Sequence, residues 1–246
     1  MTDRKIALVT GAGRGLGMGI AQHLTQSGVA VLGTYLTSKR AAVEAAGPDL
    51  VFRQLDVTRI DTFAEFATTV RNTLQESFGA ETFDYLVNNA GIGTYAPYAT
   101  TTPEQFDELV QINLKAPFFL TQALLPLINE GGRVLNVSTA LTRGVVPGMS
   151  AYAATKGAIE VLTRYQAVEL AERSIRVNTL MGGAVLTDFG GGIMHSPEVQ
   201  QLSAHTIAQG RIAMPDDITA AVPAVLSDSF QWATGAIIDL SGGQSL

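Results

Sequence analysis

The chain has 246 residues, of which 46% are hydrophobic and 15% are charged, which is enough apolar material for a domain with a substantial core. Its net charge of -6 and the lack of a long basic run argue against a nucleic-acid partner. It contains no cysteine, which excludes disulfides, thiolate metal sites and cysteine nucleophiles.

The N-terminal segment enters a short apolar run that ends at Gly11, without the long hydrophobic region of a signal peptide. No apolar stretch of about 18 residues follows, so we expect no membrane segment and a cytoplasmic location. Because the composition does not shift along the chain, we expect residues 1–246 to form one domain.

Short β-branched runs alternate with longer amphipathic segments along the chain. The runs predict seven strands, at residues 5–11, 30–35, 50–56, 84–91, 133–139, 175–181 and 236–242. Thr102-Pro103-Glu104 and Pro215-Asp216-Asp217 are typical of helix starts. Strands that are apolar nearly throughout suit a parallel sheet covered on both faces, so we expect an α/β, doubly wound Rossmann fold with its ligand site at the carboxyl edge.

The segment TGAGRGLG (10–17) follows the first predicted strand and opens a helix. Its glycines, Gly11, Gly15 and Gly17, fit the pattern G-x-x-x-G-x-G rather than the usual G-x-G-x-x-G. A glycine turn at this place lets the backbone approach a pyrophosphate, which the helix N-terminus can bind. The motif therefore predicts a dinucleotide site, and a purely structural turn is the alternative.

The end of the second predicted strand indicates which dinucleotide binds. There is no acidic residue between Asp3 and Glu44, where an acid would contact the ribose 2′-OH of NAD. Hydroxyls and cations are present instead, at Tyr35, Thr37, Ser38, Arg14, Lys39 and Arg40. These groups can bind a 2′-phosphate, so the sequence predicts NADP(H), with a neutral loop indifferent to the phosphate as the alternative.

AYAATK (151–156) places Tyr152 and Lys156 one helical turn apart on the same face. Taken alone, the pair also fits a packed tyrosine beside a solvated lysine. Further along, FGGGIMHSP (189–197) predicts a flexible hinge in a long loop, and we expect a substrate lid at about 185–210.

Seven motifs in order resemble the short-chain dehydrogenase/reductase family: TGAGRGLG, Asp56, NNAG (88–91), Asn113, NVST (136–139), YAATK (152–156) and IRVN (175–178). They span nearly the whole chain. TYLTSKRAA and DLSGG are most similar to the NADPH-dependent 3-oxoacyl-acyl-carrier-protein reductases and related ketoreductases. The resemblance implies an NADPH-dependent carbonyl reductase that converts a ketone or 3-oxoacyl thioester to a secondary alcohol.

The resemblance also implies the roles of individual residues. Tyr152 would protonate the carbonyl oxygen, Lys156 would bind the nicotinamide ribose and stabilise the tyrosinate, and Asn113 would hold a water that links Lys156 to solvent. Thr139 takes the position of the catalytic serine, with Ser138 as the fallback. Cofactor contacts are expected at Gly11, Arg14, Gly15, Leu16, Gly17, Tyr35, Thr37, Ser38, Asp56, Val57, Asn89, Ala90, Gly91, Tyr152, Lys156, Val185 and Thr187.

For Tyr152 to act near neutral pH, its pKa has to fall from about 10 toward 7, a preference for the phenolate of about 4 kcal/mol. A nearby ammonium group and a positive nicotinamide would supply that preference. Two departures from the family pattern bear on activity. Thr139 adds a methyl group to the site, and Gly182-Gly183 replaces Pro-Gly, which loosens the turn leading to Val185 and Thr187.

Two alternative functions remain open: an NAD-dependent alcohol dehydrogenase working in the oxidative direction, and a catalytically weak nucleotide-binding scaffold. No metal site is expected, since His23, His195 and His205 lack ligand spacing. The partners expected are a small carbonyl substrate and further copies of the chain, because PFFLTQALLPLI (117–128) is apolar on more than one face. A homotetramer or dimer is therefore predicted, with no nucleic acid and no membrane partner.

Overall fold

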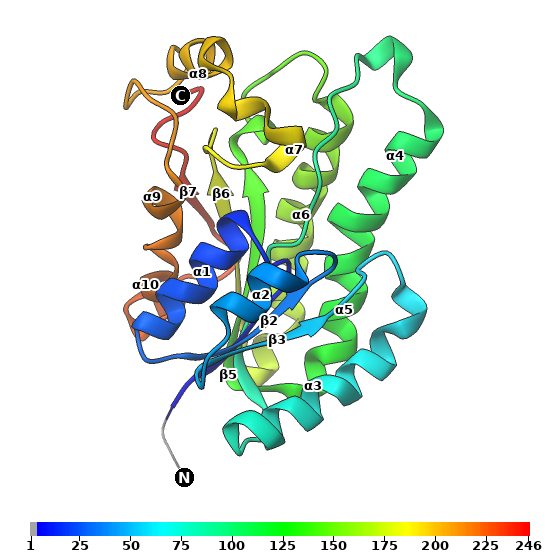
Figure 1. Cartoon of the computed structure of the whole chain (residues 1–246), viewed down its shortest axis with the longest axis vertical. Coiled ribbons are helices and arrows are strands. Elements are labelled where there is room, and N and C mark those ends of the chain that lie inside the picture. The colour runs from blue at the N-terminus through cyan, green and yellow to red at the C-terminus, as the bar shows by residue number, and fades with distance from the viewer. Residues whose placement is uncertain (1–3) are drawn as a thin grey trace.

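The fold is one seven-stranded sheet with helices on both faces (Figure 1). The structure, a computed structural model, describes residues 4–246, so residues 1–3 of the domain expected over 1–246 lie outside the described part. The strand order is β3-β2-β1-β4-β5-β6-β7. Every neighbouring pair is parallel. The predicted α/β class with a doubly wound Rossmann sheet is confirmed.

The strands overlap the seven predicted runs. They are β1 (Ile6–Val9), β2 (Ala30–Tyr35), β3 (Leu50–Gln54), β4 (Phe83–Asn88), β5 (Ile128–Thr139), β6 (Arg176–Gly182) and β7 (Ile237–Leu240). In the centre of the sheet Leu8 pairs with Leu32 on one side and with Leu86 on the other, and all three are buried.

Each face of the sheet has its own apolar core. Ile6 and Leu8 of β1 belong to one core and Ala7 and Val9 to the other, because successive strand side chains point to opposite faces. The first core packs against α3 (Phe63–Phe78), α5 (Ala116–Leu124) and α6 (Ser150–Glu169). The second packs against α1 (Gly15–Gln26), α9 (Pro215–Thr219) and α10 (Val222–Val225).

Helix α2 (Lys39–Ala45) also packs on the second core, through Ala45. The remaining helices contribute no residue to either core: α4 (Pro103–Val110), α7 (Phe189–Gly192) and α8 (Pro197–Ala204). Both predicted helix starts are confirmed. The Thr102 hydroxyl accepts a hydrogen bond from the Gln105 amide, and the Gln105 side chain accepts one from the Thr102 amide, which together cap α4. Helix α9 begins at Pro215, as expected for a proline in the first turn.

Strand β5 begins earlier than predicted, at Ile128 rather than at residue 133. Ile128 pairs with Phe83, and the register then shifts before Arg133 pairs with Tyr85. The intervening Gly131 has φ +71°, a backbone conformation that interrupts the regular ladder. Gly131 and Gly132 interrupt the apolar run, so the run predicted only the part of the strand that follows them.

The parallel strands end at one edge, which carries the polar and glycine residues that follow them. Strand order reverses between β1 and β4, because the chain runs outward from β1 to β3 and then returns to the other side of β1. In sheets of this kind, ligands bind outside the carboxyl ends of the strands at such a reversal. Helices α7 and α8, in the segment that follows β6, lie over this end of the sheet (Figure 1).

Candidate active site

The turn between β1 and α1 is packed too closely for side chains. Gly11 has φ +66°, and a Cβ atom there would lie 3.0 Å from the Cα of Ala90. A Cβ on Gly17 would collide with the Gly11 carbonyl oxygen. Arg14 precedes α1 without a side-chain cap, and the first turn holds no acidic residue. The first amides of α1 are thus available to an anion such as a pyrophosphate, while the half-buried Leu16 packs on the core.

The end of β2 packs directly on this glycine turn. A Cβ on Gly13 would collide with Ser38 Oγ and would lie 2.9 Å from Tyr35 Cβ. Arg14, Thr37 and Lys39 are exposed beside them. Arg40 instead pairs with Glu44, at 2.8 Å between Nε and Oε1. Hydroxyls and two cations with no ion-pair partner among the described residues therefore lie beside the glycine turn, a set of groups that can bind a phosphate.

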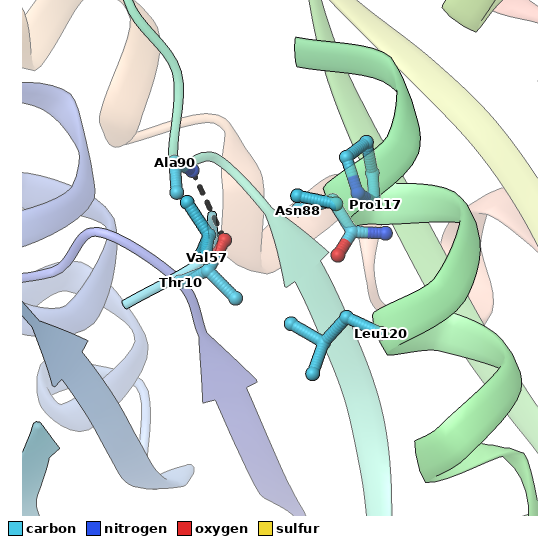
Figure 2. Close-up of a pocket in the computed structure, with 7 residues that line it drawn as sticks. Thr10, Val57, Asn88, Ala90, Pro117 and Leu120 are labelled. Carbon is cyan, nitrogen blue, oxygen red and sulfur yellow. Dashed lines mark hydrogen bonds between the residues drawn. The ribbon is translucent and has the colours of Figure 1, made fainter. Parts of the chain in front are cut away.

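The ends of β3 and β4 complete this side of the site. Asp56 Oδ1 accepts hydrogen bonds from the Thr58 amide at 2.9 Å and the Thr58 hydroxyl at 2.7 Å. Asn89 Nδ2 donates to the Thr10 carbonyl at 2.9 Å, and the Ala90 amide donates to Thr10 Oγ1 at 3.0 Å (Figure 2). These bonds join the end of β4 to the glycine turn and fix the positions of Asn89 and Ala90.

Asn88, one residue earlier, points into the protein instead. Its Nδ2 donates to Thr121 Oγ1 at 3.0 Å and to Asn136 Oδ1 at 2.9 Å. Its Oδ1 has no hydrogen-bond partner among the described residues, beside a cavity of about 10 Å³ that Val57, Leu120 and others line (Figure 2). Asn88 therefore supports the sheet interior, whereas Asn89 faces the site.

Ser138 and Thr139, the last residues of β5, face opposite ways. The Ser138 hydroxyl donates to Glu160 Oε1 at 2.7 Å. The Thr139 side chain instead lies beside the Tyr152 phenol, whose pKa it lowers, and its Oγ1 accepts from the Leu141 amide at 3.3 Å. Of these two hydroxyls, only that of Thr139 is directed to Tyr152.

Helix α6 carries Tyr152 and Lys156, one turn apart and both buried. Lys156 Nζ lies 6.0 Å from the centre of the Tyr152 ring and donates to the Val137 carbonyl at 2.9 Å. The pair is therefore not a packed tyrosine beside a solvated lysine. The ammonium group lies over the face of the phenol ring and is bonded to a backbone carbonyl of β5.

Burial changes the pKa values of both residues. It raises the pKa of Tyr152, and the hydrogen bond from Thr139 opposes that rise. This direction differs from the expected lowering, because desolvation of the buried phenol is the largest cause of the shift and the Lys156 ammonium does not contribute to it. Burial also lowers the pKa of Lys156 to about 8, since the charged ammonium is removed from water.

Asn113 lies in a π-helical turn, Gln111–Lys115, between α4 and α5 rather than in regular α-helix. Its Oδ1 accepts from the Ile92 amide at 3.0 Å, and its Nδ2 donates to the Ile92 carbonyl at 2.9 Å. A Cβ on Gly91 would lie 3.0 Å from Asn113 Oδ1 and 3.4 Å from Lys156 Nζ. The absence of a side chain at Gly91 thus leaves room for both side chains beside the end of β4.

The segment after β6 crosses this edge of the sheet. The Leu186 amide donates to the Ala213 carbonyl at 2.9 Å, next to the bridge between Val185 and Ala213. Thr187 approaches Gly15, with its Cγ2 atom 4.0 Å from where a Cβ would lie. Two residues later, the Phe189 ring lies 5.6 Å from that of Tyr152. The sequence indicated the glycines that follow Phe189, but it did not single out Phe189 or the Glu160 partner of Ser138.

The structure thus brings the expected catalytic residues and the expected cofactor contacts to one edge of the sheet. Within the described range 4–246, no group of three or more His, Asp or Glu side chains is arranged to hold a metal ion. No helix in the same range is long and apolar enough to cross a membrane.

Known proteins match this chain over nearly its full length. A family model described as enoyl-(acyl carrier protein) reductase matches residues 11–245. Versicolorin reductase 1 of Aspergillus parasiticus is 33% identical over 98% of this chain and 96% of its own. The hydroxynaphthalene reductase-like protein Arp2 of Metarhizium majus is also 33% identical, over 97% and 94%. The crystal structure of the angucycline C-6 ketoreductase LanV with bound NADP superposes with a TM-score of 0.92 at 35% identity, over 98% and 95%.

Replacing the buried ammonium should stabilise the fold. Between pH 8 and 10.5 the unfolded chain binds more protons at Lys156 than the folded chain, because burial lowers the pKa from 10.5 to about 8. At pH 7 this difference costs the folded state about 3 kcal/mol. Lys156→Met should therefore raise the free energy of unfolding at pH 7, measured by urea denaturation, and the gain should shrink as the pH rises to about 9.5.

Lys115→Met, at an exposed lysine, is the matched control and should leave the free energy of unfolding nearly unchanged. A Lys156→Met variant that is less stable than the parent at pH 7 would show that the bond to Val137 outweighs the cost of burial.

Proposed function

The chain belongs to the short-chain dehydrogenase/reductase family and is an NADPH-dependent carbonyl reductase, and we propose that Thr139, Tyr152 and Lys156 carry out the reduction. The observation that carries this proposal is the group of these three side chains at the end of β5. The Thr139 hydroxyl lies close enough to the Tyr152 phenol to lower its pKa, and the Lys156 ammonium is buried one turn along the helix. Two hydroxyls that meet in this way suit a single acceptor, the oxygen of a carbonyl group.

The residues around the glycine turn fit NADPH. The uncapped N-terminus of α1 would bind the pyrophosphate, and Arg14, Tyr35, Thr37 and Ser38 would surround the 2′-phosphate. Asp56 and Val57 would contact the adenine, and Asn89, Ala90, Gly91, Val185 and Thr187 would line the path to the nicotinamide. When bound, NADPH supplies the hydride for the carbonyl carbon.

The protein groups supply the proton and hold the carbonyl oxygen. Thr139 donates a hydrogen bond to that oxygen, and Tyr152 transfers its phenolic proton to it as negative charge develops. Lys156, with a pKa of about 8, is mainly protonated at neutral pH and can return a proton to the tyrosinate. We further propose that Asn113 holds the water that links Lys156 to solvent, which is supported by the approach of both side chains to Gly91.

The named relatives support reduction over the alternative of alcohol oxidation. Versicolorin reductase 1 and the ketoreductase LanV are both named for reduction, and LanV was crystallised with NADP. The alternative of a weak scaffold rested on Thr139 and Gly182. Thr139 directs its hydroxyl to Tyr152, and a Cβ on Gly182 would have only an ordinary contact, 3.4 Å from Ile218 Cδ1.

The named relatives support a ketone as the substrate class. Their names refer to versicolorin, hydroxynaphthalene and the C-6 ketone of an angucycline. We propose a ketone, or the 3-oxoacyl thioester expected from the sequence, as the substrate. We also propose that residues 1–246 act as one domain in the cytoplasm, with the segment at about 185–210 as a lid over the substrate. The parallel bridge between Val185 and Ala213, with backbone bonds from Leu186 to Ala213 and from Ala213 to Ala184, supports fixed ends for this lid.

Tyr152→Phe should abolish ketone reduction and leave NADPH binding nearly unchanged, because it removes only the transferable proton. We expect kcat to fall by at least about 100-fold, measured from NADPH absorbance. Tyr165→Phe, at an exposed tyrosine of the same helix, is the control and should keep the parent rate. Residual turnover above about a hundredth of the parent rate would show that Tyr152 is not the acid.

The two hydroxyls at the end of β5 can be separated in the same assay. Thr139→Val keeps the shape of the side chain and should reduce kcat, whereas Ser138→Ala should affect mainly the contact with Glu160. If Ser138→Ala reduced kcat more than Thr139→Val, Ser138 rather than Thr139 would be the residue that donates to the carbonyl oxygen.

Tyr35→Asp should shift the cofactor preference from NADPH toward NADH. The carboxylate would repel the 2′-phosphate but could accept hydrogen bonds from the 2′-OH of NADH. We expect a change of about 2 to 4 kcal/mol in relative kcat/KM, measured for both cofactors at one saturating ketone concentration. If the parent already prefers NADH, or if the variant loses both cofactors equally, Tyr35 does not lie beside the phosphate.

We propose that the exposed apolar side chains of α5 and α6 form a contact between copies of the chain. They are Phe118, Phe119, Val161, Tyr165 and Val168. Light scattering should then give two or four times the chain mass of 25.9 kDa. Phe119→Glu should lower that mass, because a buried unpaired carboxylate opposes association, and Val43→Glu on α2 is the control. A monomeric parent would contradict the proposal.

A further inference from the structure

The Phe189 ring covers the Tyr152 side chain. The two ring centres lie 5.6 Å apart, with 56° between the ring planes. The ring also lies on the backbone at Gly93, where a Cβ atom would be 2.5 Å from Phe189 Cε1 and 2.8 Å from Cζ. Tyr152 is only 7% exposed, whereas Phe189 is 40% exposed. Phe189 is therefore the solvent-facing part of the cover over Tyr152.

The backbone directly after Phe189 consists of three consecutive glycines with positive φ. Gly190, Gly191 and Gly192 have φ +63°, +78° and +77°, a region that other residues rarely adopt. A Cβ on Gly190 or Gly191 would have no neighbour within 4 Å, so packing does not explain these glycines. The segment is anchored before Phe189, where Ala184 and Leu186 bond to Ala213. A fixed end followed by three glycines allows the ring to move while the anchor stays in place.

Exposed apolar side chains lie on the three segments that follow β4, β5 and β6: Tyr95, Val145, Val146 and Ile193. The Phe189 ring lies against the segment after β4, at Gly93. A bond from the Ala96 amide to the Gly148 carbonyl at 2.9 Å joins this segment to the one after β5. Apolar side chains are thus available on the segment that Phe189 contacts and on the segment bonded to it.

We propose that Phe189 is a specificity-determining residue that selects ketones carried on a fused, apolar ring system. This inference rests on the proposed reduction at Tyr152. A ketone reaches the Tyr152 hydroxyl only after the Phe189 ring leaves it, and this movement breaks the contacts with Tyr152 and Gly93. A substrate shifts that equilibrium only through contacts that it gains in the open arrangement. Fused rings replace the lost contacts by packing on the displaced Phe189 ring, whereas a small ketone does not.

The test compares 1-tetralone, a two-ring ketone, with butanedione, a small one, using NADPH-saturated enzyme. Phe189→Ala should lower the KM for butanedione, because no ring has to be displaced, and raise the KM for 1-tetralone, because the packing surface is lost. We expect the ratio of the two kcat/KM values to change by about tenfold or more. Phe106→Ala, at a phenylalanine that is 44% exposed on α4, is the matched control and should leave the ratio unchanged.

An equal change for both ketones, or no change for either, would overturn the inference. Phe189→Leu keeps an apolar side chain and guards against local unfolding in the alanine variant. It should give a ratio between those of the parent and Phe189→Ala.

A second readout does not depend on turnover. Trp232 is the only tryptophan of the chain and is 98% exposed, so Trp232→Phe removes the background fluorescence without disturbing the core. Phe189→Trp in that variant places an indole on Tyr152. With NADP+ bound, titration with 1-decalone, which has no aromatic absorbance, should change the emission saturably. Emission that does not respond at any concentration would show that residue 189 stays in place and would overturn the inference.

The two proposals fail in different ways. If carbonyl reduction at Tyr152 is wrong, Tyr152→Phe keeps its activity whatever Phe189 does. If only the role of Phe189 is wrong, Tyr152→Phe loses activity, while Phe189→Ala discriminates between the two ketones as the parent does.

Discussion

The parallel pairing of all strands is the constraint from which the site follows. Because β1 is parallel to both β2 and β4, and β5 to both β4 and β6, their carboxyl ends share one edge. Residues that are more than a hundred positions apart in the sequence therefore become neighbours there, such as Gly15 and Thr187. The helices that cover both faces leave this edge as the place where backbone amides and polar side chains meet a ligand.

Much of this arrangement could be predicted from the sequence, since it depends on local patterns. Apolar runs of strand length located all seven strands, and the two-residue period of a strand separated Ser138 from Thr139. The pattern failed where backbone geometry interrupts it. Gly131 interrupts the apolar run at the start of β5, so this part of the strand was not predicted. The π-helical turn at Asn113 does not change the hydrophobic periodicity of the sequence and could not be predicted from it. The contact of Phe189 with Tyr152 depends on how a long segment folds back, which no local pattern contains.

The electrostatics of the site also depend on long-range packing. The spacing of Tyr152 and Lys156 indicated a shared helix face, but not that the ammonium group would bond to the Val137 carbonyl. With that bond in place, the ammonium group lies 6.0 Å from the centre of the Tyr152 ring. The direction of the change in the pKa of Tyr152 is consequently set by burial, a property of the folded chain that residue spacing cannot supply.

In our proposal, Phe189 links the selection of substrates to the exclusion of water from Tyr152. The ring contributes to the apolar cover over Tyr152, and burial is the main cause of the raised pKa of that side chain. A fused-ring ketone that took the place of this cover would bring an apolar surface of its own and would keep water away, so that hydrogen-bond donors beside the carbonyl oxygen would act on its developing charge without competition from solvent. A small ketone would leave room for water beside Tyr152. The geometry that we propose to favour bulky ring ketones would therefore also give them the drier site.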